Sequence, residues 1–276
     1  MVPQGSTYVA EEKTFVNSGY MKDRSASRIY FYTDNKKPSY VTLKTPDGKA
    51  DTTHAGGVAY KDGYIYLTSG SNINIYSWED IKAAATKGKS VTYSHQISTD
   101  YGNAFCHIEG DILYVGEFYH PSAYPTDVSH HFTTDCGDEH HAIITLFDIN
   151  RIKNSGFKTA IPIKAYSITD YAQGMCITGE GNICITTSYA FRTSHIYVYE
   201  PMNNELPDGE ITVNGAKVPL YYIDSNHLKE DIKFAPMSEE LVYVDGRVYT
   251  ISESASCKYL FGKFCGGDKI YSIEIK

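Results

Sequence analysis

The sequence has little of what marks a membrane protein or a nucleic-acid-binding protein. No apolar run approaches the roughly 18 residues that a membrane-spanning helix requires. Basic residues are in the minority, with 25 Lys and Arg against 33 Asp and Glu, and the formal net charge is −8. A chain with this charge is not expected to bind nucleic acid through phosphate contacts. We therefore expect neither a membrane span nor a nucleic-acid partner.

The N-terminus also lacks the apolar segment of a secretory signal. The residues Met1–Gln4 lead directly into the first strand pattern. We expect that a longer native N-terminus precedes Met1 and that the protein is extracellular or attached to the cell surface.

Short signatures of known chemistry are missing as well. The sequence contains no HExxH, no zinc-finger spacing, no GxSxG, no P-loop and no DxDxDG calcium loop. Helical patterns are confined to residues 79–85 and 224–229. What is abundant is Tyr, with 25 residues, and Phe, with 11, both of which suit half-buried strands. This composition predicts an all-β protein.

One pattern recurs five times along the chain. It is a pair of strands joined by a tight turn such as Asp-Gly or Glu-Gly, which indicates a β-hairpin. The hairpins cover residues 4–18, 56–69, 103–116, 173–186 and 240–252. A third strand follows each, at 28–32, 73–77, 142–147, 195–199 and 269–274. The segments SRIYFY (27–32) and SHIYVY (194–199) are closely alike. Fourth strands are predicted at 40–43, 91–95, 161–166 and 218–222.

Five repeats of four antiparallel strands resemble a β-propeller, whose repeat length lies in the same range. The resemblance concerns architecture and does not identify a family. It implies one domain, residues 1–276, with a last blade that lacks its outer strand. The blades are expected at about 1–50, 51–100, 101–170, 171–233 and 234–276. The alternative, a β-sandwich, gives no reason for five similar hairpins.

In a propeller, the residues at the start of each innermost strand face the mouth of the central channel. Here these residues are polar: Gln4, His54, Asn103, Gln173, and Ser238 or Glu239. We expect the small residues beside them, such as Gly5 and Gly174, to leave the channel open. This ring predicts a small polar pocket. The alternative is that the same groups hydrogen-bond neighbouring blades or channel water.

Loops of unequal length are predicted to surround that mouth, and such loops often carry function. Arg24 and Arg192 are candidates for binding a carboxylate or phosphate, and Tyr189 for binding a sugar or peptide. The longest loop, 117–141, is rich in His and acids. From it we select His130, Asp138 and His140 as candidate ligands of a divalent metal, the only cofactor that the sequence suggests. The alternative is a solvated loop.

The six cysteines fall into three groups. Cys106, Cys176 and Cys184 lie in apolar strand patterns and are predicted to be core residues. Cys257 and Cys265 flank a short loop and are candidates for a disulfide. Cys136 has no evident partner.

Taken together, these patterns predict a propeller that binds a small molecule, glycan or peptide at the top face of its channel, as a monomer. The residues assigned to binding are Gln4, Arg24, His54, Asn103, Gln173, Tyr189, Arg192 and Glu239. Two other functions are kept as alternatives. One is a hydrolase or lyase that uses His54 with Glu117 or Glu239, and the other is a protein-interaction platform. The sequence leaves open whether the chain is an enzyme.

Overall fold

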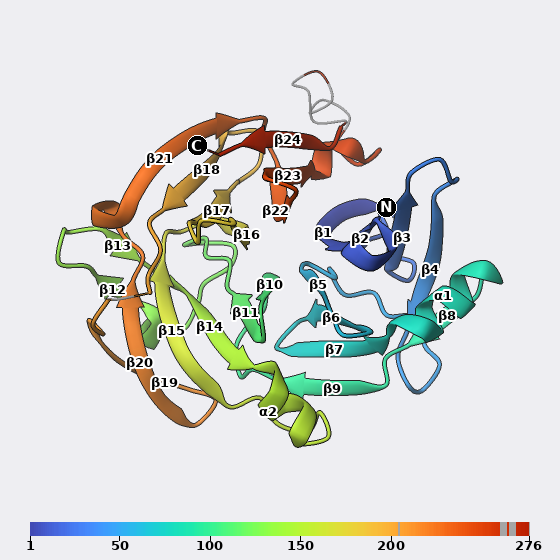
Figure 1. The fold of residues 1–276 in the computed structure, drawn as a ribbon, viewed down its shortest axis with the longest axis horizontal. Coiled ribbons are helices and arrows are strands. Elements are labelled where there is room, and N and C mark those ends of the chain that lie inside the picture. Colours follow the sequence, from blue (N-terminus) through green and yellow to red (C-terminus); the bar gives the residue numbers. More distant parts are fainter. Residues whose placement is uncertain (204, 260–263, 265–268, 276) are drawn as a thin grey trace.

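The computed structural model describes residues 1–203, 205–259, 264 and 269–275. It contains five sheets that radiate from a common centre, which is the arrangement of a five-bladed β-propeller (Figure 1). The predicted fold class is therefore confirmed. Within these described residues, no helix is long and apolar enough to cross a membrane.

Each blade starts with an innermost strand and its antiparallel partner, as the repeated hairpins predict. The innermost strands are β1 (Val2–Val9), β5 (Val58–Lys61), β10 (Phe105–Glu109), β16 (Ala172–Ile177) and β22 (Ser238–Val244). The second strands are β2 (Thr14–Tyr20), β6 (Tyr64–Ser69), β11 (Ile112–Gly116), β17 (Ile183–Thr187) and β23 (Arg247–Ser252). The third strands are β3 (Arg28–Thr33), β7 (Asn72–Ser77), β14 (Ala142–Asp148), β18 (Ser194–Tyr199) and β24 (Tyr271–Glu274).

The outer strands depart from the sequence prediction in two blades. Blades one to four end in β4 (Ser39–Lys44), β9 (His95–Ser98), β15 (Pro162–Ile168) and β21 (Leu228–Phe234), and the described part of blade five has three strands. The segment predicted at 91–95 instead forms β8 (Ser90–Thr92), which pairs in parallel with β4 of blade one. The segment predicted at 218–222 lies in β20 (Ala216–Tyr222), which pairs in parallel with β15 of blade three. The sequence prediction had assigned these segments to blades two and four. Both assignments were wrong, because an apolar edge strand pairs with whichever sheet lies beside it.

The remaining elements lie in connections between these strands. They are α1 (Trp78–Thr86), α2 (Ile149–Asn154), the strand β19 (Gly209–Val213), which pairs with β20, the short pair β12 (Phe132–Thr133) and β13 (Glu139–His140), and the 3-10 turns η1 (Ala10–Glu12), η2 (Val128–His130), η3 (Ser225–His227) and η4 (Glu253–Ala255). The helical patterns at 79–85 and 224–229 correspond to α1 and to η3.

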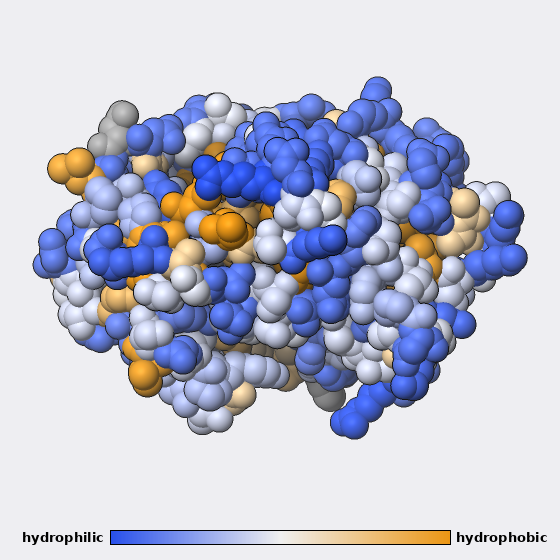
Figure 2. All heavy atoms as spheres, turned by 90° about the horizontal axis from the view of Figure 1, so that it is seen from below, coloured by the Kyte–Doolittle hydropathy of each residue, from blue (hydrophilic) through white to orange (hydrophobic). Residues whose placement is uncertain are grey.

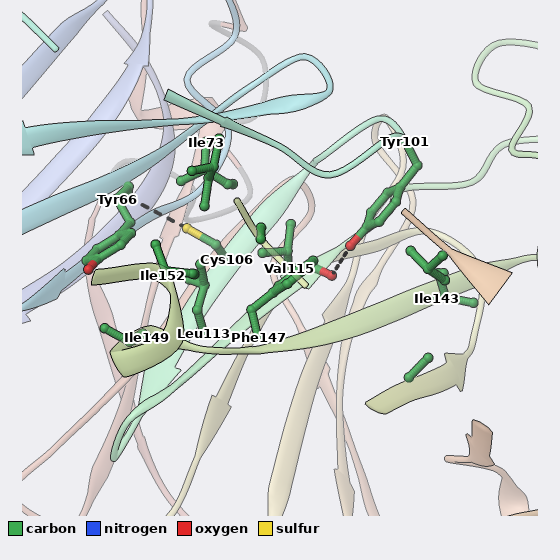
Figure 3. Close-up of a cluster of buried hydrophobic side chains, with 14 of the residues drawn as sticks. Tyr66, Ile73, Tyr101, Cys106, Leu113, Val115, Ile143, Phe147, Ile149 and Ile152 are labelled. Carbon is green, nitrogen blue, oxygen red and sulfur yellow. Dashed lines mark hydrogen bonds between the residues drawn. The ribbon is translucent and has the colours of Figure 1, made fainter. Parts of the chain in front are cut away.

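The core consists of side chains that pack between neighbouring blades. In the cluster between blades two and three, Tyr66 and Ile73 meet Leu113 and Phe147, all fully buried (Figure 3). Burying one such side chain contributes about 1.5–3 kcal/mol. The outer edge of the disc is mostly hydrophilic in edge-on view, with a hydrophobic patch left of centre (Figure 2). Cys106, Cys176 and Cys184 are buried in these clusters, as predicted.

Glycines at the centre let the innermost strands approach one another closely. A Cβ atom at Gly57 would lie 2.2 Å from the Cys106 backbone nitrogen, and one at Gly174 would lie 2.5 Å from the Glu240 Cα atom. The innermost strands pack in the order β1, β5, β10, β16 and β22, and β22 packs on β1 to close the ring. These glycines therefore serve blade-to-blade packing, and not an open channel as we expected from the sequence.

We expect Gly57→Ala to lower the free energy of unfolding by about 1–3 kcal/mol, because the added methyl group must displace neighbouring backbone. Gly209→Ala is the matched control, since a Cβ atom there meets nothing within 4 Å. That variant should be neutral or slightly stabilised. Chemical denaturation of both variants measures the difference, and equal stabilities would contradict this role of Gly57.

Candidate functional site

Three of the innermost strands begin with a β-bulge, and each bulge contains a polar residue. Pairing of β1 with β2 skips Gln4, and pairing of β16 with β17 skips Gln173. In β22 the pairing passes from Ser238 directly to Leu241, which places Glu239 in the irregular stretch. A bulge turns a side chain away from the regular alternation of a strand. A β-bulge thus places a polar side chain at the channel mouth in blades one, four and five.

These residues line one cavity of about 1160 Å³. The predicted ring is brought together there, with one member from each blade: Gln4, His54, Asn103, Gln173 and Glu239. The sequence left Ser238 and Glu239 as alternatives for blade five. Ser238 is buried and hydrogen-bonds Thr186 and Thr250, so Glu239 is the residue that lines the cavity.

A second ring of residues lines the same cavity, and only part of it was singled out from the sequence. Each member lies at the end of a second strand or directly after it: Tyr20, Gly70, Glu117, Ser188 and Glu253. The end of the second strand recurs at the same place in every repeat, as the start of the first strand does. The residues at the end of each second strand could therefore have been identified from the sequence repeats.

Glu253 is held in place by groups from blade one. The Gln4 side-chain amide donates a hydrogen bond to Glu253 Oε1 at 2.8 Å, and the Tyr20 hydroxyl donates to the same oxygen at 3.3 Å. Burial raises the pKa of Glu253, and the nearby Lys258 ammonium partly opposes this. These bonds join the first and last blades at the mouth of the channel.

His54 packs against Tyr20 on this side of the cavity, with 4.8 Å between the ring centroids. Desolvation, together with the Lys258 charge, lowers the pKa of His54. Lys258 Nζ donates to the Tyr20 hydroxyl and also lies over its ring. His54 is therefore a neutral imidazole at neutral pH, able to donate or accept one hydrogen bond at each nitrogen.

Glu239 lines the cavity as a largely buried carboxyl. It is only 3% exposed, and it makes no hydrogen bond to any residue that the structure describes. Burial, and then the charges of Glu253 and Glu240, raise the pKa of Glu239 well above its ordinary value. The raised pKa favours the protonated form of this carboxyl, which can both donate and accept hydrogen bonds.

Glu117 is paired with a different histidine from the one expected. Its Oε2 atom accepts hydrogen bonds from His130 Nδ1 at 2.9 Å and from the Ile143 backbone N–H at 3.1 Å. Both side chains are buried. Donation from Nδ1 leaves His130 Nε2 as the nitrogen with a free lone pair. The expected pairing of Glu117 with His54 is thus replaced by a Glu117–His130 pair on the cavity wall.

Aromatic rings form another part of the wall. The lining includes Phe118, Tyr124, Tyr189 and Phe191. Phe118 and Tyr124 are in edge contact at 5.4 Å, and Tyr189 packs on His120 at 4.2 Å. The predicted place of Tyr189 at this rim agrees with the structure. The cavity lining therefore combines acids with aromatic rings.

Two predicted cationic residues lie elsewhere. Arg24 and Arg192 are exposed on their loops, and neither belongs to the described lining of the cavity. Lys258, which the sequence analysis did not select, is the lining residue that carries a positive charge. It lies within blade five, in the connection between β23 and β24, where nothing in the repeat pattern distinguishes it.

The three candidate metal ligands do not converge. His130 bonds Glu117, His140 Nδ1 bonds Ser167, and Asp138 accepts from the Ser225 backbone N–H. Among the residues described, no group of three or more His, Cys, Asp or Glu is arranged to hold a metal ion. The predicted metal set is wrong, because residues close in the loop sequence point in different directions. The predicted Cys257–Cys265 disulfide lies outside the described residues, since Cys265 is not among them.

The raised pKa of Glu239 predicts a specific pH dependence of stability. From pH about 4.5 upward the unfolded carboxyl loses its proton while the native one keeps it, so stability falls as pH rises toward the native pKa. Glu239→Gln cannot titrate and should escape this loss. The variant should gain on the wild type by up to about 1.4 kcal/mol for each pH unit in that window.

Urea denaturation at a series of pH values measures this difference. Glu180→Gln, an exposed acid in the turn between β16 and β17, is the control and should show a flat difference. A flat difference for Glu239→Gln as well would show that Glu239 is ionised in the native protein.

Comparison with known proteins identifies the fold and no family. No family model and no curated protein matches the chain. Among solved structures, the chain resembles the PQQ-bound aldose sugar dehydrogenase of Streptomyces coelicolor, with 12% identity, a TM-score of 0.50, and coverage of 100% of this chain and 78% of that one. It also resembles the glutaminyl cyclase of Myxococcus xanthus, with 8% identity, a TM-score of 0.49, and coverage of 91% and 85%. At these identities the likeness concerns the fold alone.

Proposed function

We propose that the protein binds a small polar ligand in the cavity at its channel mouth. The observation that carries this proposal is Glu239, a buried carboxyl that lines the cavity and has no partner among the described residues. An unpaired buried polar group costs about 1–3 kcal/mol. A ligand that hydrogen-bonds Glu239 recovers this free energy, which makes the site selective for polar molecules.

Other groups of the cavity add unused hydrogen-bonding capacity. The side chains of His54 and Gln173 make no hydrogen bond to any described residue, and the buried Asn103 Nδ2 also has no partner among them. The aromatic wall offers flat apolar surface beside these polar groups. Ligand sites commonly combine mainly apolar walls with a few polar groups in this way. A hydroxyl-rich molecule such as a sugar fits the combination.

The shape of the site favours this proposal over an interaction platform. A platform for another protein presents a broad, flat patch, whereas the top face here is hollowed by a cavity of about 1160 Å³. That volume is above the usual range of about 300–1,000 Å³ for small-molecule pockets. The cavity therefore has room for a mono- or disaccharide-sized ligand.

Saturation-transfer NMR with a panel of monosaccharides, disaccharides, amino acids and small amines tests binding directly. We expect hits that His54→Ala or Gln173→Ala weakens by at least about tenfold, because each change removes one polar contact of about 1.4 kcal/mol. Arg192→Ala is the control, since it alters an exposed cation on the same face outside the lining. If no compound binds, or if all three variants bind like the wild type, the cavity is not the site.

A second candidate is catalysis, and the Glu117–His130 pair favours it. A carboxylate that holds one imidazole nitrogen leaves the other free to take up a proton, which is the arrangement of a general base. In this form of the hydrolase or lyase hypothesis His130 replaces His54. We expect His130→Gln to slow conversion of a bound compound by about 10²–10⁴-fold.

NMR of each hit over time with the wild type and His130→Gln measures this effect. The saturation-transfer signal of the same compound shows whether binding is retained. Equal rates for the two proteins, or no conversion by the wild type, would remove catalysis and leave the binding proposal intact.

A further inference from the structure

Three carboxyl groups gather on one side of the cavity, at the junction of blade five with its neighbours. Glu239 and Glu240 are consecutive in the bulge of β22, and Glu253 directly follows β23. The three are close enough that the charges of Glu240 and Glu253 act on Glu239. Like charges at short range destabilise one another, so this grouping needs compensation.

Two of the three carboxyls receive hydrogen bonds from the protein itself, although Glu240 Oε2 is buried without a partner in the described part of the chain and burial also raises the pKa of Glu240. Glu240 Oε1 accepts hydrogen bonds from the backbone N–H groups of Met175, at 3.0 Å, and Leu241, at 3.3 Å. Glu253 accepts from Gln4 and Tyr20. Glu239 has no such donor in the described part of the chain, although it is only 3% exposed to solvent. A ligand that enters the cavity can supply such a donor.

The charge of the cavity lining indicates what kind of donor this is. The described lining holds five acids and one ammonium group: Asp100, Glu117, Asp127, Glu239, Glu253 and Lys258. Lys258 is already engaged with the hydroxyl and ring of Tyr20. His54 adds no charge at neutral pH. A cation inside the cavity is therefore attracted by the lining as a whole.

We propose that the ligand of this cavity carries a protonated amine and that the carboxyl of Glu239 is the group that binds it. This inference rests on the proposed function, which it deepens by naming a ligand class. The ammonium group supplies the hydrogen bonds that Glu239 lacks, and it offsets the repulsion among Glu239, Glu240 and Glu253.

Binding of an amine changes the protonation of Glu239. Burial and the neighbouring acids favour the protonated form of this carboxyl in the free protein. An ammonium ion stabilises the carboxylate form, so the O–H bond of Glu239 breaks and its proton passes to the buffer. The groups that face Glu239 are Glu240 and Glu253 of its own blade, with Gln4, Tyr20, His54 and Lys258 around Glu253. Neutral ligands cause no such release.

Isothermal titration calorimetry with matched pairs of probes tests the proposal. Glucosamine is compared with glucose, and benzylamine with benzyl alcohol, in phosphate and in HEPES, two buffers that contain no primary amine and whose ionisation enthalpies differ. We expect each amine to bind at least about tenfold more tightly than its neutral counterpart, a difference of about 1.4 kcal/mol. The measured enthalpy should differ between buffers as expected for release of one proton.

Glu239→Gln keeps the shape of the side chain but cannot ionise, so it should lose the preference for amines and the buffer dependence. Glu180→Gln, remote from the cavity in the β16–β17 turn, should keep both. Neutral compounds that bind as well as amines, with no buffer dependence, would overturn this inference and leave the proposed function standing. Failure of these probes and of every compound in the NMR panel would overturn both.

Discussion

Close contact between the innermost strands is the constraint on which the rest of this structure depends. Gly57 and Gly174 have no room for a Cβ atom, because neighbouring backbone lies within 2.2 and 2.5 Å of its position. Five sheets can then meet around a narrow centre and bury their apolar faces against each other. Ring closure needs only the packing of β1 on β22, which brings Gln4 of the first blade to Glu253 of the last.

The bulges follow from the same geometry. A regular strand would turn alternate residues toward its neighbouring blades, where the close packing leaves no space for a long polar side chain. Skipping Gln4, Gln173 and Glu239 in the pairing frees these residues to face the cavity. The bulges thus place polar side chains around the channel mouth. Because the residue in the bulge differs between blades, the ring contains both amide and carboxyl groups.

The sequence predicted the features that depend on the residue pattern within one repeat. It did not predict the features that depend on contacts between segments far apart in the chain. The hairpins, the five blades and the ring from Gln4 to Glu239 follow from alternation and turn residues within each repeat. The pairing of β8 with β4, and of β20 with β15, was not predictable, because an edge strand has the same pattern whichever sheet it joins. His130 was selected for a metal, but its partner Glu117 is fixed by the path of the long loop.

The three acids of blade five show how one electrostatic problem is solved in different ways. Glu240 is stabilised by backbone N–H groups, and Glu253 by Gln4 and Tyr20 from the facing blade. Those donors belong to the fold and remain in place whatever the cavity contains. Glu239 has no such donor among the described residues, and burial favours its protonated form, so a ligand can replace that proton without disturbing a strand. A buried acid whose proton can be replaced by a ligand cation is therefore suited to bind positively charged ligands. Because Glu239 lies in a bulge, its side chain can change protonation state while the close-packed innermost strands keep their positions.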